Sequence, residues 1–280
     1  MLHPPIRHLL RVLIWVALML SVAYCQDKQS QPEKLAYGAD RANVPDAIAK
    51  LKAGDFLAVH VDLIVGAGAT EAIPALEKEF GRVQDPLLKA KIAGGLLRLG
   101  DKDNAYWDFL VQFAAPAIES DAPNFMEIGP DGKFLPGPSA DFIAWAKGHN
   151  LSTESPGENS VYLLPAKVIL LGWSGDPRGI PLLRRALLSP NYQVEIAAAL
   201  GLAEIGDQDS VPFIVEACRK APADAAAVIA QSLIYFDTPE AQGAVDRYIP
   251  KDIAKIYRDA RAHGKTSPLS DPLYDKVPNQ

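Results

Sequence analysis

The chain has 280 residues, of which 49% are hydrophobic and 22% are charged, and its formal net charge is −6. This length and apolar content suffice for one large core or for an extended array of repeats. The negative charge argues against nucleic acid or an anionic membrane surface as a partner, because either would repel the chain.

The first 25 residues have the three-part pattern of an export signal. Arg7 and Arg11 precede an apolar run over residues 12–22, and small residues follow. This run is short for a membrane span, so we expect a signal peptide at 1–25 and a periplasmic or extracellular protein. Cleavage would leave 26 basic against 34 acidic residues, a charge of −8, and no membrane span in the mature chain. A lipoprotein is the alternative, because VAYC resembles a lipidation box ending at Cys25.

Residues 26–43 are polar and lack periodicity, which is typical of a flexible leader. After them the chain resembles itself, since an apolar helical run, a short corner and a second helical run recur five times. Four corners are marked by glycines whose spacings are 32, 75 and 31 residues, namely Gly68, Gly100, Gly175 and Gly206. The long step indicates an insertion of about 40 residues, at 119–159, between the second and third pairs.

The repeat predicts a leading helix at 45–53, five helix pairs and a closing helix at 250–263. The pairs are expected at 55–66 and 70–80, 86–99 and 103–117, 161–173 and 178–188, 191–205 and 209–219, and 223–235 and 239–248. Such units cannot bury their apolar faces alone and therefore stack on one another. The sequence thus predicts an all-α fold, an α-solenoid over residues 44–263, followed by an extended C-terminal tail at 264–280.

The clearest unit reads AAALGLAEIGDQDSVPFIVEA, over residues 197–217. A proline follows the corner glycine by six places in three pairs, at Pro74, Pro181 and Pro212. This pattern resembles the short HEAT-like repeats of phycobilisome lyase proteins, over residues 55–118 and 160–250. The resemblance implies the fold and says little about function, because such repeats serve enzymes, assembly factors and receptors alike. The export signal argues against the lyase role itself, which is cytoplasmic.

The predicted insertion is rich in proline and glycine in its first half, and its second half contains a short helical pattern with Ser139 as the expected cap. Its four aromatic side chains are too many for a freely solvated loop, so we expect them to hold it against neighbouring helices. The alternative is a partner-binding surface that includes Phe134, Trp145 and His149.

Asp-x-Asp occurs at two corners, residues 101–103 and 207–209. A calcium loop needs further oxygens at alternate positions and a distant glutamate, which neither corner has. We therefore expect the glycine to end the first helix in the left-handed conformation and a polar residue to cap the second. The residues expected to do so are Gly68, Thr70, Gly100, Asp103, Gly175, Asp176, Gly206 and Asp209.

The remaining residues indicate no catalytic or metal chemistry. His60, His149 and His263 lie in different units, and no serine elbow or phosphate loop is present in the sequence. Cys218 lies in an apolar helical pattern, which favours a buried thiol over a nucleophile. The sequence therefore predicts no metal and no cofactor.

The expected function is that of a non-enzymatic scaffold, exported from the cytoplasm, that binds another protein. Arg184 and Arg185 form the one local cluster of charge suited to an acidic ligand. Two alternatives stay open: a lyase-like enzyme or enzyme subunit with a site between the insertion and adjacent pairs, and a lipid-anchored envelope assembly factor. A pocket with convergent polar groups would favour the enzyme, and a broad groove would favour the scaffold. Partner identity and oligomeric state stay open.

Overall fold

The computed structural model describes residues 41–152, 163–262 and 268–269. The predicted signal peptide, the leader up to residue 40, the end of the insertion, His263 and most of the predicted tail lie outside these residues. The described residues are mostly helical, with thirteen α-helices and one two-stranded hairpin among them.

The helices fall close to the predicted ranges. The first helices of the five pairs are α3 (Ala58–Gly66), α5 (Pro86–Arg98), α8 (Leu163–Trp173), α10 (Tyr192–Ile205) and α12 (Ala223–Gln231). The second helices are α4 (Ile73–Arg82), α6 (Asn104–Ile118), α9 (Ile180–Ala186), α11 (Val211–Lys220) and α13 (Pro239–Tyr248). Helix α2 (Val44–Ala53) precedes them, and α14 (Lys251–Ala262) follows.

Short 3-10 turns modify three of these pairs. They lie at Thr70–Ala72 (η2), Pro177–Gly179 (η3) and Gln208–Ser210 (η4), and each leads directly into a second helix that has proline at its second position. Another 3-10 turn, Ser232–Tyr235 (η5), extends α12. The second helices therefore begin later as α-helices than the periodicity alone predicts.

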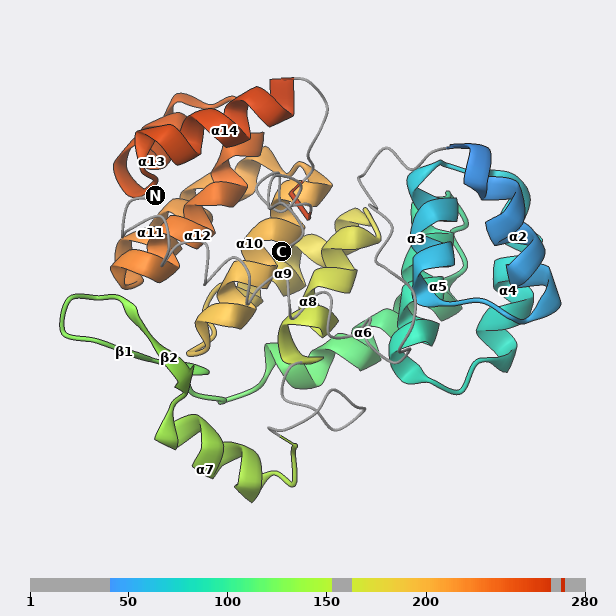
Figure 1. Ribbon diagram of the computed structural model, residues 1–280, viewed down its shortest axis with the longest axis horizontal. Helices are drawn as coiled ribbons and strands as arrows, with labels where there is room; N and C mark the ends of the chain where they lie inside the picture. The colour runs from blue at the N-terminus through green and yellow to red at the C-terminus, as the bar shows by residue number, and fades with distance from the viewer. Residues whose placement is uncertain (1–40, 153–162, 263–267, 270–280) are drawn as a thin grey trace, which may run out of the picture.

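The first helices contact one another in chain order, α3 with α5, α5 with α8, α8 with α10 and α10 with α12. Figure 1 shows the elements following one another across the molecule, from α2–α5 on the right to α11–α14 on the left. Helices α8, α10 and α12 are apolar nearly all round and are buried. Helices α4 and α11 are amphipathic and leave one face exposed. The core therefore runs along the first helices, and the second helices supply much of the surface.

Glycine permits the closest helix approach. A Cβ atom on Gly172 of α8 would lie 2.2 Å from the Cα atom of Gly201 on α10. Helical glycine is intrinsically unfavourable by about 1 kcal/mol relative to alanine. This backbone contact explains the glycine at position 172. A Cβ atom on Gly201 would meet a milder restriction, at 3.1 Å from Leu183 Cδ2 and 3.3 Å from Gly172 Cα.

The second and third helix pairs pack against each other, although 75 residues separate their corner glycines, Gly100 and Gly175. Helix α6 contacts both α8 and α9. Arg98 on α5 donates hydrogen bonds to the Trp173 carbonyl oxygen (2.8 Å) and to Glu204 Oε1 (2.6 Å). The Glu204 side chain is only 4% exposed, so its carboxylate lies out of water, whereas the Arg98 side chain is 28% exposed. Three successive first helices are thereby joined through one guanidinium group.

The predicted insertion contains a feature that the all-α prediction did not include. Strands β1 (Met126–Ile128) and β2 (Phe134–Pro138) form an antiparallel hairpin, which precedes helix α7 (Ala140–Gly148). The Ser139 hydroxyl caps α7 by accepting a hydrogen bond from the Phe142 amide, at 3.1 Å. The hairpin arises because glycine and proline turn the chain before a helical period can form.

The hairpin and the residues just before it are attached to the beginnings of two first helices. The Tyr192 amide of α10 donates to Asn124 Oδ1 at 2.8 Å, and the Phe134 amide donates to Asp224 Oδ2 of α12 at 3.0 Å. In Figure 1 the hairpin and α7 accordingly lie along the lower edge of the molecule. The region 119–152 is therefore anchored by polar contacts to the pairs that follow it.

Candidate functional site

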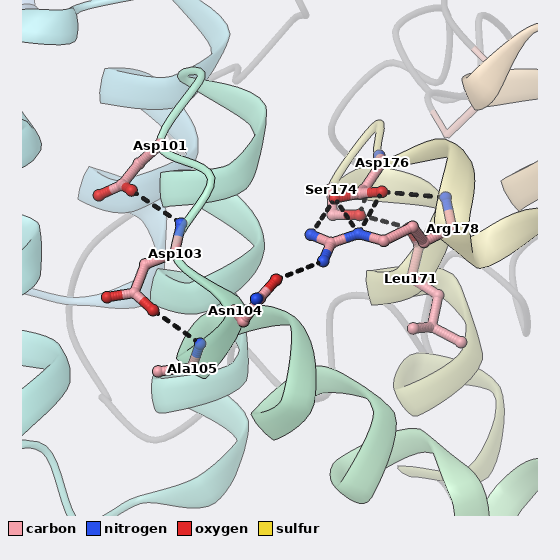
Figure 2. Close-up of polar contacts among 8 residues, drawn as sticks. All are labelled: Asp101, Asp103, Asn104, Ala105, Leu171, Ser174, Asp176 and Arg178. Carbon is pink, nitrogen blue, oxygen red and sulfur yellow. Dashed lines mark hydrogen bonds and ion pairs between the residues drawn. The ribbon is translucent and has the colours of Figure 1, made fainter.

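The corner carboxylates bind helix amides. Asp101 accepts a hydrogen bond from the Asp103 amide (3.1 Å), and Asp103 accepts one from the Ala105 amide (2.9 Å), as Figure 2 shows. Asp176 accepts from the Arg178 amide (2.9 Å) and from Arg178 Nη2 (2.6 Å). These carboxylates occupy amides that would otherwise lack a helical partner. Within residues 41–152, 163–262 and 268–269, no three His, Cys, Asp or Glu side chains are grouped to hold a metal ion.

The preceding helices end at glycines with a left-handed backbone. Their φ angles lie between 67° and 97°, at Gly68, Gly100, Gly175 and Gly206. An L-residue with a side chain is strained in this conformation, whereas glycine is not.

Two of the expected side-chain caps are wrong. Thr70 lies inside η2 and Asp209 inside η4, and neither the 3-10 turns nor the following helices have a side-chain cap at their N-termini. The turns move the cap positions back to Ala69 and Asp207. A side chain caps a helix from an extended backbone just before it, and the 3-10 conformation removes that geometry.

Asp207 instead joins two pairs. Arg184 on α9 donates to Asp207 Oδ2 through Nη2 (2.7 Å) and to the Ser210 hydroxyl through Nε (2.7 Å). The neighbouring Arg185 is exposed, and its nearest carboxylate oxygen belongs to Glu119 at 3.5 Å. Both arginines were predicted to meet an acidic ligand. The Arg184 guanidinium instead donates its hydrogen bonds to Asp207 and Ser210 of this chain.

A second arginine forms a similar link. Arg178 Nη1 donates to Asn104 Oδ1 of α6 at 2.9 Å, which Figure 2 shows, and its guanidinium lies 4.7 Å from the centre of the Trp107 ring. Arg178 thus connects the corner of the third pair to α6. Arg184 connects α9 to the corner of the fourth pair.

The predicted partner-binding residues of the insertion differ in exposure. Phe134 is 6% exposed, so the prediction that it belongs to a binding surface is wrong. Its apolar ring is more stable in the core than in water. Trp145 is partly buried and donates from Nε1 to Asp121 Oδ1 at 2.7 Å. Its ring stacks on the exposed His149 imidazole with centroids 4.4 Å apart. Only Trp145 and His149 reach the surface together.

Glu195 and Cys218 are two buried groups that the sequence pattern did not place near each other. Glu195 of α10 is 8% exposed, and burial raises the pKa of its carboxyl to about 7. Burial, with the nearby Glu195 charge, raises the pKa of the Cys218 thiol to about 12. The thiol is therefore protonated and out of contact with solvent at neutral pH, which does not suit a nucleophile. The available signal in the sequence was a glutamate beside the apolar run of residues 196–203 in this first helix.

The sequence analysis did not identify Lys89 of α5 or Lys167 of α8 as candidate site residues. Both ammonium groups lie over phenyl rings of α6. The sequence showed the lysines and the aromatic residues, but their approach depends on how three helices pack.

Residues 166–234 match the family model for HEAT repeats. The matched range runs from α8 to η5 and thus covers the third and fourth pairs and the first helix of the fifth. No curated protein matches the chain. In the part of the chain that the structure describes, no helix has the length and apolar character needed to cross a membrane. Residues 166–234 are thus similar to HEAT repeats.

Proposed function

We propose that this protein is a non-enzymatic scaffold that binds another protein, built as an α-solenoid of about five HEAT-like helix pairs. The HEAT-repeat match over α8 to η5 carries the proposal, because such repeats stack into arrays whose surfaces bind protein partners. The ordered contacts from α3 to α12 support extension of the array over the earlier pairs.

The proposed binding surface centres on two second helices, α9 and α11, and on the residues that directly follow α9. Leu188, just after α9, is 76% exposed, and Phe213 on α11 is 51% exposed. The Arg184 guanidinium lies 4.8 Å from the centre of the Phe213 ring, which holds that ring in place at the surface. Ordered apolar and aromatic side chains that remain exposed are suited to partner contacts. We include Arg185 and, from the insertion, Trp145 in the same proposed surface, with His149 beside Trp145.

The partner experiment uses the full chain in its native host. Cross-linking and mass spectrometry identify the partner, and affinity is then measured with both purified proteins. Leu188→Ser and Phe213→Ser should each weaken binding on the order of tenfold, as expected for loss of an apolar contact worth about 1.4 kcal/mol. Leu57→Ser, at an exposed leucine before α3, is the matched control and should bind as the wild type does.

Two results would contradict the scaffold. One is the failure of any specific partner to cross-link to the wild type. The other is a stoichiometric metal or cofactor in the purified protein, which would favour the enzyme alternative with a site beside the insertion.

We also propose that the scaffold is exported. The basic start and the apolar run of residues 1–25 support this. Cell fractionation and intact-mass measurement test it: we expect a periplasmic or extracellular product that begins at Gln26. A lipid mass on Cys25 would instead support the envelope-anchored alternative, and an unprocessed cytoplasmic chain would contradict export.

A further inference from the structure

Several cationic side chains lie over aromatic rings, and they differ in whether a carboxylate is also present. Lys91, Arg178 and Arg184 each form an ion pair, with nitrogen to oxygen distances of 2.6 to 2.7 Å. Lys89 and Lys167 form none with any residue that the structure describes. Among the residues that the structure describes, these two ammonium groups therefore have rings but no counter-charge.

The two lysines lie at either end of a pair of stacked rings. Lys89 Nζ is 5.3 Å from the centre of the Phe109 ring and 4.8 Å from that of Phe80. Phe109 and Phe113 stack with centroids 6.4 Å apart and planes 8° from parallel. Lys167 Nζ is 5.2 Å from the centre of the Phe113 ring. We call Lys89, Phe109, Phe113 and Lys167 the lysine–phenyl site, and all four side chains are partly exposed.

The surroundings favour an anion. Lys89 is the fourth residue of α5 and lies at the end of its first turn, where the helix dipole favours an anion. Burial lowers the pKa of the Lys167 ammonium, which shows that the charged form has lost hydration. A phenyl ring compensates only part of this loss, and a carboxylate compensates more because it can accept a charge-assisted hydrogen bond.

We propose that the lysine–phenyl site binds an acidic segment of the partner protein, with carboxylates on Lys89 and Lys167 and an apolar side chain against the Phe109 and Phe113 rings. The proposal rests on the proposed scaffold function and names the chemistry of one contact. A protein segment fits better than a nucleic acid, because the net charge of −6 repels a polyanion over long range while two local lysines attract a few carboxylates.

The test uses the mature full-length chain and a fluorescein-labelled peptide of repeated Glu-Phe-Glu-Gly units, with fluorescence anisotropy as the measurement. A second peptide carries glutamine in place of every glutamate. We expect saturable binding of the acidic peptide only. Lys89→Gln and Lys167→Gln should each weaken it on the order of tenfold, as loss of one charge-assisted contact predicts.

Two controls separate charge from folding. Lys167→Arg keeps the positive charge and should retain binding within about threefold. Lys255→Gln removes an exposed lysine of α14 and should leave binding unchanged. Thermal unfolding of each variant shows whether the fold is kept, and loss of binding by a folded Lys167→Gln variant is the supporting result.

Three results would overturn the proposal: no saturable binding of the acidic peptide, equal binding of the glutamine peptide, or Lys89→Gln and Lys167→Gln variants that bind as the Lys255→Gln control does. None of these results removes the scaffold function, because its own test uses an identified partner and substitutions at Leu188 and Phe213. Failure of the site and failure of the scaffold are therefore distinguishable.

Discussion

Substitution of Gly172 by alanine tests the close contact between α8 and α10. The new Cβ atom would lie 2.2 Å from Gly201 Cα and 2.8 Å from the Gly201 carbonyl carbon and oxygen. Carbon atoms in contact are normally about 3.5 Å apart or more, so the helices would have to separate by roughly 1 Å. Because the opposing atoms are backbone, no change of rotamer can relieve the overlap.

The expected magnitude follows from two opposing effects. Overpacking of this kind costs about 1–3 kcal/mol and occasionally more, and a backbone clash should lie at the upper end. Alanine recovers about 1 kcal/mol of helix propensity. We therefore expect Gly172→Ala to lower the free energy of unfolding by about 2 kcal/mol.

Urea denaturation followed by circular dichroism measures this change. Gly243→Ala is the matched control, because Gly243 lies within α13 and a Cβ atom there meets no heavy atom within 4 Å. That variant should be more stable than the wild type, by about 0.5–1 kcal/mol. The reasoning is refuted if Gly172→Ala is as stable as the wild type, or if both substitutions change stability in the same direction.

Three further predictions concern caps, a buried pair and pH. Asp103→Ala should lower the free energy of unfolding by about 1 kcal/mol, whereas Asp209→Ala should change it by less than about 0.5 kcal/mol in the same urea assay; equal losses would contradict the cap assignment. Arg98→Met should cost about 3–5 kcal/mol because it leaves Glu204 buried without its partner, and adding Glu204→Gln should recover part of that loss in a thermal-unfolding double-mutant cycle. Because burial raises the pKa of Glu195 to about 7, the folded state favours the protonated carboxyl, and stability should fall as pH rises from about 4.5 to above 7. Glu195→Gln should remove about 2–3 kcal/mol of this dependence, measured as unfolding free energy at pH 5 and pH 8, and an unchanged pH profile would contradict it.

The corners between the paired helices show how much of the local structure the sequence predicted. Its periodicity predicted the helices to within a few residues, because apolar spacing and glycine act over one or two turns. The same local reasoning placed caps at Thr70 and Asp209, where 3-10 turns displaced them. Proline six places after the glycine was visible in the sequence, but its association with a 3-10 turn was not.

The predicted insertion shows a different limit of prediction from the sequence. The sequence indicated that its aromatic residues pack against neighbouring helices, but it could not tell which of them do so. Phe134 is buried and His149 is exposed, although both were proposed for one surface. The buried Phe134 donates its amide hydrogen bond to Asp224, which lies 90 residues further along the chain, and local sequence cannot show such a contact.

By itself, the sequence determined the helices, the corners and the buried character of Cys218, since each follows from residues within one helix pair. The tertiary structure decided which charges are paired. Asp207 binds Arg184 from the preceding pair, whereas Lys89 and Lys167 approach the rings of α6 without a described carboxylate. Electrostatic interactions depend on distance and on burial, and both are fixed only when helices far apart in the chain pack together.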